Sequence, residues 1–311
     1  METKNFADTG KQVSRLGFGA WQLGNRNSQE WGDPDQDPVR LVHAAIDAEI
    51  NFFDTAPNYG QGASTDVLGK ALQGRRHEVV INSKFGHSPS GTSFAPADLR
   101  PSVEDSLRRL KTDYIDSLLL HNPNYTLCDG SHPIHEELEI LKQEGKILCY
   151  GASIDESTPI LQLVRSSKAS AVMPLYNIFF QECEKAFAEA AKAGYAVIVK
   201  VPLDSGWLTG KYSDQSRFDD IRSRWTAGVI ARRAALTAEL KDIIGENLSL
   251  HQVALGFILA AHEVTTVIPG TKNEAQLQSN IQAANTKLPE DLVHKLKEFY
   301  TREILPDPLP W

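Results

Sequence analysis

Four residues of the chain form a set that could reduce a carbonyl group or carry out the reverse oxidation. They supply a carboxylate, a phenol, an ammonium and an imidazole, from Asp54, Tyr59, Lys84 and His121. A phenol can protonate the alkoxide left by hydride addition, but its ordinary pKa of about 10 is high for transfer near neutral pH. A lysine beside the phenol lowers that pKa, an aspartate keeps the lysine charged and fixed, and a histidine orients the carbonyl oxygen.

The elements that must position these side chains form an alternating series of strands and helices. A hairpin turning at residues 8–11 is followed by eight predicted strands, each with helical sequence behind it. The strands are predicted at 16–23, 51–55, 79–85, 114–121, 147–154, 171–176, 195–203 and 266–269. The helices are predicted at 38–50, 65–72, 99–110, 134–144, 160–166, 182–193, 231–244, 250–262, 274–283 and 290–302.

Eight such units in 311 residues predict an α/β fold, a (β/α)8 TIM barrel with an N-terminal β-hairpin and extra C-terminal helices. We expect one domain covering residues 1–311. An open doubly wound sheet is the alternative, but its G-x-G-x-x-G turn fails here, because Gln22 stands at the third glycine position. We interpret Gly17 and Gly19 as close packing at a strand end. The strands of a barrel share one mouth at their carboxyl ends, where the four side chains would meet.

Composition and charge exclude several classes of protein. The formal net charge is −8, which argues against nucleic acid or an anionic membrane as a partner, since both need a basic surface. The longest nearly apolar run, residues 253–261, is too short to cross a membrane, and the first residues lack an apolar signal core. Cys128, Cys149 and Cys183 are widely spaced and fit buried thiols in a reducing compartment, so we expect a cytoplasmic protein.

Motifs along nearly the whole chain resemble those of the aldo-keto reductase family. Each motif is short, but all of them occur in the family's order and spacing. The resemblance implies a (β/α)8 barrel, a nicotinamide cofactor that is usually NADPH, no metal, and Tyr59 as the acid–base residue. The motifs are Arg15-Leu-Gly-Phe-Gly19, Phe53-Asp-Thr-Ala56 with Tyr59-Gly60, Ser83-Lys-Phe-Gly86, Val103-Glu-Asp-Ser-Leu-Arg-Arg-Leu110 with Thr112-Asp-Tyr-Ile-Asp116, Leu120-His121, Gly145-Lys146-Ile147 with Gly151-Ala-Ser153, Tyr176-Asn177, Pro202-Leu203 with Gly206-Trp-Leu-Thr-Gly-Lys211, and Ile268-Pro-Gly270 with Asn280.

The resemblance places Ser153 against the nicotinamide carboxamide. Three nearby positions depart from the family pattern: Ile154 and Met173 stand where asparagine and glutamine are usual, and Lys200 stands where many members stack an aromatic ring. Our hypothesis is that Lys200 points at the cofactor or substrate mouth. The alternative is a salt-bridged lysine at the rim.

The resemblance also implies that the cofactor pyrophosphate lies against backbone amides of Leu203, Asp204, Ser205 and Gly206. The Asp204 carboxylate cannot itself bind an anion, so an amide contact or a structural role is expected for this residue.

The 2′-phosphate of NADP(H) is expected at Gly270, Thr271 and Lys272, because a helix N-terminus with a nearby lysine suits an anion. Gln276 stands where some members have an arginine, which leaves Lys272 almost alone to favour NADP(H) over NAD(H). Gln276 and Asn280 would flank the adenine. We therefore predict an NADP(H)-dependent oxidoreductase that interconverts an aldehyde or ketone, sugars included, and its alcohol.

The substrate is expected to be a small carbonyl compound or alcohol in contact with Trp21, Tyr59 and His121. Trp21 lies just past the first strand, where family members often have a substrate-facing aromatic residue. Loops at 87–96, 122–131 and 213–228 and the tail after residue 301 are expected to set specificity. Trp311 in that tail is expected either to fold over the mouth or to fray. Trp31 is expected to lie either in the core or in the pocket. We expect a monomer or weak oligomer.

Two other functions stay open at this point. A Schiff-base lyase or aldolase could use Lys84 as its nucleophile, but that role needs a neutral lysine. A regulatory or scaffold protein could keep the cofactor with little turnover, as channel-associated relatives of the family do. The spacing of His132 and His135 could hold a metal, but no third ligand stands out, and we interpret the pair as a solvated helix start.

Overall fold

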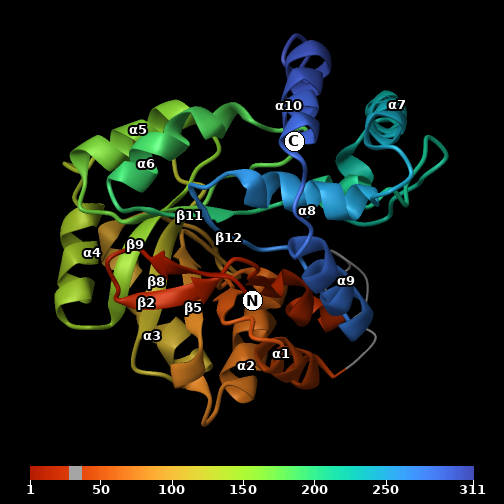
Figure 1. The fold of residues 1–311 in the computed structure, drawn as a ribbon. Coiled ribbons are helices and arrows are strands. Elements are labelled where there is room, and N and C mark those ends of the chain that lie inside the picture. Colours follow the sequence, from red (N-terminus) through yellow and green to blue (C-terminus); the bar gives the residue numbers. More distant parts are fainter. Residues whose placement is uncertain (28–36) are drawn as a thin grey trace.

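Eight parallel strands form the centre of the computed structural model, which describes residues 1–27 and 37–311 (Figure 1). Trp31 lies outside the described residues. Neighbouring strands follow the order β12-β11-β10-β9-β8-β5-β4-β3. The strands are β3 (Phe18–Gly19), β4 (Phe52–Asp54), β5 (Val80–Phe85), β8 (Ile115–His121), β9 (Ile147–Ser153), β10 (Ala171–Val172), β11 (Ala196–Val199) and β12 (Val264–Val267).

The two outer strands of this sheet, β3 and β12, approach each other and nearly close the barrel. The Gly17 amide donates to the Val267 carbonyl at 2.8 Å, and the Val267 amide donates to the Arg15 carbonyl at 3.0 Å. A Cβ on Gly19 would lie 3.1 Å from the carbonyl oxygens of Ile268 and Pro269, so this approach favours glycine. The predicted (β/α)8 barrel is confirmed, and so is close packing at Gly19.

Helices surround the strands, with α7 and α10 further out in Figure 1. Helix α1 begins as predicted, because Asp37 accepts a hydrogen bond from the Val39 amide at 3.0 Å and Pro38 takes the first helical position. The helices are α1 (Pro38–Asp47), α2 (Ala63–Ala71), α3 (Pro96–Leu110), α4 (Ile134–Gln143), α5 (Ser157–Ser166), α6 (Phe187–Lys192), α7 (Ala227–Ile244), α8 (Leu250–Ala260), α9 (Glu274–Ala284) and α10 (Glu290–Phe299).

Several strands are shorter than the sequence predicts. The first predicted strand, 16–23, keeps only β3 and then turns into the 3-10 helix η1 (Ala20–Asn27). The sixth strand ends before Pro174, which has no amide hydrogen for the ladder, and the seventh ends at Val199, just before Val201 leaves the extended conformation at φ 53°. A single bridge between Leu175 and Lys200 prolongs that pairing toward the mouth.

Other local differences lie in the connections. Residues 87–92, predicted as loop, form the short hairpin of β6 (His87–Ser88) and β7 (Gly91–Thr92). The predicted helix at 182–193 is divided into the 3-10 helix η5 (Glu182–Ala186) and α6. The last predicted helix continues past α10 as a wider turn, η8 (Tyr300–Ile304).

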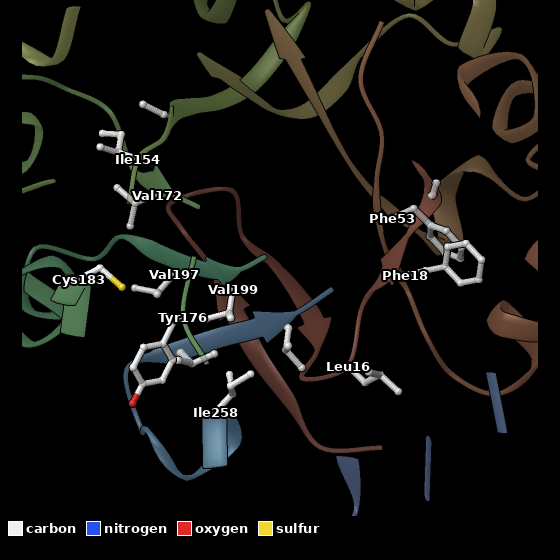
Figure 2. Close-up of a cluster of buried hydrophobic side chains, with 14 of the residues drawn as sticks. Leu16, Phe18, Phe53, Ile154, Val172, Tyr176, Cys183, Val197, Val199 and Ile258 are labelled. Atoms are coloured by element: carbon white, nitrogen blue, oxygen red, sulfur yellow. The ribbon is translucent and has the colours of Figure 1, made fainter. Parts of the chain in front are cut away.

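The core has two parts, one inside the barrel and one between the strands and the helices. The predicted N-terminal hairpin, β1 (Thr3–Phe6) and β2 (Lys11–Ser14), contributes Phe6 and Val13 to the inner part. The Phe6 and Phe52 ring centroids are 5.3 Å apart. Figure 2 shows a portion of the outer part, where Val197 and Val199 of β11 lie near Ile258 of α8.

The three cysteines are buried with free thiols, as predicted. Burial raises the pKa of Cys128 to about 11 and that of Cys149 to about 12. These thiols are therefore protonated and inert near neutral pH. Among the described residues, no helix has both the length and the apolar character needed to cross a membrane.

Candidate active site

The Lys84 ammonium joins three of the four predicted catalytic residues. Its Nζ donates to Asp54 Oδ1 at 2.6 Å, to the Thr55 carbonyl at 3.0 Å and to the Tyr59 hydroxyl at 3.0 Å. Asp54 ends β4 and Lys84 lies in the neighbouring strand β5, which is why the two side chains meet. Asn82 donates a further hydrogen bond to Asp54 Oδ1 at 2.7 Å. The sequence-predicted Asp54–Lys84–Tyr59 arrangement is thus present in the fold.

Tyr59 reaches this group from η2 (Tyr59–Gly62), the short helix that follows β4. The Trp21 ring stacks on the Tyr59 ring, with centroids 5.3 Å apart and an interplanar angle of 12°. The two turns approach closely because Gly60, at φ 55°, packs on Gly24. A Cβ on Gly60 would lie 2.3 Å from the Gly24 carbonyl oxygen. Trp21 therefore contacts the phenol that the sequence assigns to catalysis.

His121 ends β8 and faces the Tyr59 ring edge-on, with centroids 6.0 Å apart. Its Nδ1 is buried and has no hydrogen-bond partner among the described residues. Burial, together with the charges of Lys84 and Lys200 and with His87, holds the pKa of His121 well below its usual value. A neutral imidazole at this position can donate a hydrogen bond to an oxygen without carrying charge.

Lys200, just after β11, lies among polar groups at the same end of the barrel. Its Nζ donates to Asn122 Oδ1 at 2.8 Å and to Ser153 Oγ at 2.7 Å, and it lies 3.0 Å from Asp155 Oδ1. Ser153 in turn donates to Asn122 Oδ1 at 2.9 Å. The ion pair with Asp155 matches the salt-bridged alternative for Lys200, while a contact of Lys200 with the cofactor or substrate stays a prediction.

The segment predicted to hold the pyrophosphate, residues 203–206, is a tight turn after β11. The Gly206 amide donates to the Leu203 carbonyl at 2.8 Å, and Ser205 is nearly buried. The Asp204 carboxylate is fully buried and accepts from Arg233 Nε of α7 at 3.0 Å. Burial raises the pKa of the Asp204 carboxyl, and Arg233 partly opposes that rise. Asp204 thus turns its carboxylate inward, which leaves the surface of the turn free of its charge.

The segment predicted to hold the 2′-phosphate precedes α9. The Lys272 amide donates to Gln276 Oε1 at 3.0 Å, and Asn280 Nδ2 donates to Thr271 Oγ1 at 3.0 Å. Asn280 is buried, and Gly270 packs against the side chain of Gln22. Gln276 and Asn280 therefore hold this segment in shape, while their contact with adenine stays a prediction.

The remaining predicted positions lie deeper or further away. Ile154 belongs to the outer core and Met173 to the inner core, and both side chains are almost fully buried. Trp311 packs edge-on against Phe180 with centroids 5.7 Å apart, so the tail is docked. The predicted solvated helix start is wrong for His135, because its ring is buried and hydrogen-bonded to the Leu127 carbonyl at 2.9 Å at the start of α4.

Three residues near the site were not singled out from the sequence. His87 packs edge-on against His121 with centroids 5.0 Å apart, and Asn122 accepts hydrogen bonds from both Lys200 and Ser153. Because Asn122 directly follows His121 at a strand end, its position near the site could have been predicted from the sequence. Arg233 lies 29 positions from Asp204, and its place on α7 carries no local signal.

Comparisons with known proteins agree with this architecture. A model of the Aldo/keto reductase family matches residues 15–301. An uncharacterized oxidoreductase of Bacillus subtilis is 28% identical over 98% of both chains. Among solved structures, an aldo-keto reductase from Bacillus halodurans in its holo form has a TM-score of 0.81 at 28% identity, covering 96% of each chain. A glycerol dehydrogenase from Gluconobacter oxydans has a TM-score of 0.81 at 27% identity, covering 99% of this chain and 97% of its own.

Proposed function

The chain belongs to the aldo/keto reductase family of oxidoreductases, and from that premise we propose that it interconverts an aldehyde or ketone, sugars included, and its alcohol with NADP(H). The observation that carries the proposal is the Lys84 ammonium, which lies 2.6 Å from the Asp54 carboxylate and 3.0 Å from the Tyr59 hydroxyl. In this group, with a neutral His121 beside it, the Tyr59 hydroxyl would be the proton donor at the mouth of the barrel.

In the proposed reduction, a bound nicotinamide cofactor supplies the hydride that adds to the carbonyl carbon. Tyr59 transfers its hydroxyl proton to the carbonyl oxygen, which becomes the alcohol oxygen. The Lys84 ammonium stabilises the phenolate that remains on Tyr59, and Asp54 holds Lys84 charged and in place. His121 donates a hydrogen bond that orients the carbonyl oxygen toward Tyr59. Oxidation of an alcohol uses the same groups in reverse.

The residues around the mouth fit an anionic dinucleotide. Ser205 and Gly206 offer a hydroxyl and backbone groups to a pyrophosphate, and Lys272 stands just before α9, where a helix N-terminus favours negative charge. The Asp204 carboxylate is buried against Arg233, so it does not oppose a phosphate at that turn. We propose Leu203, Ser205, Gly206, Gly270, Thr271, Lys272, Gln276 and Asn280 as the cofactor segment, with Ser153 and Lys200 on the nicotinamide side.

A small polar substrate suits this mouth. Trp21 would form an apolar wall beside Tyr59 and His121, while His87 and Asn122 add polar groups. The structural neighbour named as a glycerol dehydrogenase makes polyols and their aldehydes reasonable first substrates to assay. The three buried free thiols fit a reducing compartment, and we propose the cytoplasm.

The geometry does not favour the Schiff-base alternative. The Lys84 nitrogen donates three hydrogen bonds, to Asp54, the Thr55 carbonyl and Tyr59, and this suits an ammonium rather than a neutral nucleophile. Trapping with borohydride in the presence of substrate should therefore leave the protein mass unchanged.

The proposed function is tested by cofactor turnover. Purified protein is assayed for NADPH and NADH oxidation against aromatic aldehydes, methylglyoxal, glyceraldehyde and aldoses, and for NADP⁺ reduction with sugars and polyols. We expect turnover with at least one carbonyl compound and its loss in Tyr59→Phe. Binding of neither nucleotide by the wild-type protein, in a fluorescence titration, would contradict the proposal.

A further inference from the structure

A buried ion pair joins helix α7 to the turn that the proposed function assigns to the cofactor pyrophosphate. Asp204 and Arg233 are both fully buried, and Arg233 Nε donates to Asp204 Oδ2 at 3.0 Å. The guanidinium also lies over the Trp225 ring, 4.4 Å from its centroid. A pair sealed from water is screened very little, so removing either partner leaves an uncompensated charge in the core.

The turn that contains Asp204 has an unusual backbone. Asp204, Ser205 and Gly206 are consecutive residues with φ of 44°, 52° and 98°. Asp204 and Ser205 carry side chains that disfavour this left-handed region, so contacts elsewhere must hold the turn in place. One such contact is the Arg233–Asp204 pair, and Arg222 supplies another by donating to the Ser205 carbonyl at 3.3 Å.

The same guanidinium also binds the C-terminal tail. Arg233 Nη2 donates to the Pro310 carbonyl at 2.9 Å, and the preceding side chain, Leu309, is buried in the outer core. Trp311 packs on Phe180 beside this contact. Arg233 of α7 therefore bonds both to the turn after β11 and to Pro310, which lies 77 positions further along the chain.

We propose that Arg233 is a positioning residue that holds the Asp204–Gly206 turn in its cofactor-binding shape and links that turn to the C-terminal tail. The proposal rests on the proposed function, because it takes this turn as the pyrophosphate site. Its consequence is that nucleotide binding at the turn and docking of residues 305–311 depend on each other. Arg233 acts through Asp204 and touches neither the cofactor nor the reacting atoms.

The first test compares nucleotide affinity in Arg233→Met, Arg233→Lys and wild-type protein by NADPH fluorescence. Loss of one partner of a buried pair is costly, so we expect the Kd for NADPH to rise at least about tenfold in Arg233→Met. Arg233→Lys, which keeps a cation beside Asp204, should show an intermediate Kd. Substrate KM at saturating NADPH should stay within about twofold of the wild-type value, because the catalytic group is untouched.

Arg76→Met is the matched control, because Arg76 pairs with a buried aspartate at the opposite end of the barrel. Its Nη2 lies 2.6 Å from the fully buried Asp116, near the start of β8. This variant should lower the thermal midpoint by less than Arg233→Met does, because Lys11 still pairs with Asp116, and should leave the Kd for NADPH within about twofold. An equal loss of affinity in both variants, or an unchanged Kd in folded Arg233→Met, would overturn the proposal.

Hydrogen exchange on the wild-type protein tests the link to the tail without any substitution. Saturating NADPH should slow exchange of amides in residues 203–206 and also in residues 305–311. Protection of the turn without protection of the tail would overturn the link. Wild-type protein that binds neither NADPH nor NADH would instead contradict the proposed function, so the two failures are distinguishable.

Discussion

The Lys84 ammonium lies 3.0 Å from the Tyr59 hydroxyl, although the two residues come from different elements. Lys84 is fixed within a strand of the barrel, whereas Tyr59 sits on a short helix above the strand ends. Burial lowers the pKa of Lys84, and the adjacent Asp54 carboxylate opposes that change. The lysine is thus held next to the phenol by a strong charge partner, which suits it to stabilise a phenolate.

The first prediction concerns Tyr59→Phe, which removes only the hydroxyl. Because a positioned acid or base contributes about 10²- to 10⁴-fold, we expect kcat/KM to fall by at least about 10²-fold. The ring still stacks on Trp21, so the thermal midpoint and the Kd for NADPH should change little. Steady-state kinetics and a nucleotide titration check this. Undiminished turnover in the variant would remove Tyr59 from the mechanism.

The second prediction follows from the lowered pKa of His121. In the folded protein this histidine binds a proton less readily than in the unfolded chain, where its ordinary pKa is about 6.5. The unfolded state therefore binds more protons in acid, and the free energy of unfolding falls as the pH decreases below about 6.5, by up to about 1.4 kcal/mol per pH unit.

Urea unfolding of wild-type protein and His121→Gln, between about pH 5 and about pH 7.5, measures this contribution as a difference in slope. His135 and His251 also have lowered pKa values through burial, but they remain in both proteins and cancel. The variant should lose less stability in acid than the wild-type protein. Parallel curves would mean that folding does not change the pKa of His121.

The barrel and the catalytic group were predictable because each depends on local pattern and on strand order. Alternating strands and helices specify the closed sheet, and a residue at a strand's carboxyl end must lie at the mouth. Asp54 and His121 end β4 and β8, so their positions followed from the strand boundaries alone. Tyr59 was chosen because it lies just beyond the second predicted strand, although its connection has no periodic pattern of its own, and the family resemblance then implied its acid–base role.

The contacts between connections were not predictable. Asn122 accepts hydrogen bonds from Ser153 and Lys200, which lie on two other strand ends, and no local spacing brings the three together. The Asp204–Arg233 pair depends on how α7 packs against a turn. The sixth and seventh strands were also predicted too long, because Pro174 lacks an amide hydrogen and Val201 turns the chain at φ 53°.

The third prediction concerns the hairpin that supplies Phe6 to the inner core. Phe6 is fully buried and packs on Phe52, so Phe6→Ala should lower the free energy of unfolding by about 3–5 kcal/mol. The candidate site lies at the other end of the barrel, and KM values measured well below the thermal midpoint should be unchanged. If Phe6→Ala raised KM as much as a substitution at the barrel mouth does, the hairpin and the candidate site would not be independent.

The fourth prediction tests the choice between NADP(H) and NAD(H). If Lys272 contacts the 2′-phosphate, Lys272→Ala removes a charge-assisted bond and should raise the Kd for NADPH by about 10- to 100-fold. The Kd for NADH should stay within about twofold. Lys295→Ala on α10, which lies apart from α9 in Figure 1, removes an equal charge and serves as the control. Equal weakening of both nucleotides by Lys272→Ala would argue against a 2′-phosphate site there.

The fifth prediction separates the nicotinamide side of the proposed site from its phosphate side. Lys200 Nζ lies within 3.0 Å of acceptors on Asn122, Ser153 and Asp155, which accounts for its three protons. Lys200 therefore orients Ser153 and Asn122 instead of offering a further donor to a ligand. Lys200→Met should leave those two side chains without their common partner and raise the Kd for NADPH by about 3- to 10-fold.

Adenosine 2′,5′-bisphosphate lacks the nicotinamide half, so its binding should not depend on Ser153 or Asn122. Its Kd should stay within about twofold in Lys200→Met but should rise with that for NADPH in Lys272→Ala. Lys142→Met, which breaks an ion pair with Asp8 of the N-terminal hairpin, controls for loss of a lysine. If Lys200→Met weakened both ligands equally, the variant would be acting on the whole site, and Lys200 could not be assigned to its nicotinamide side.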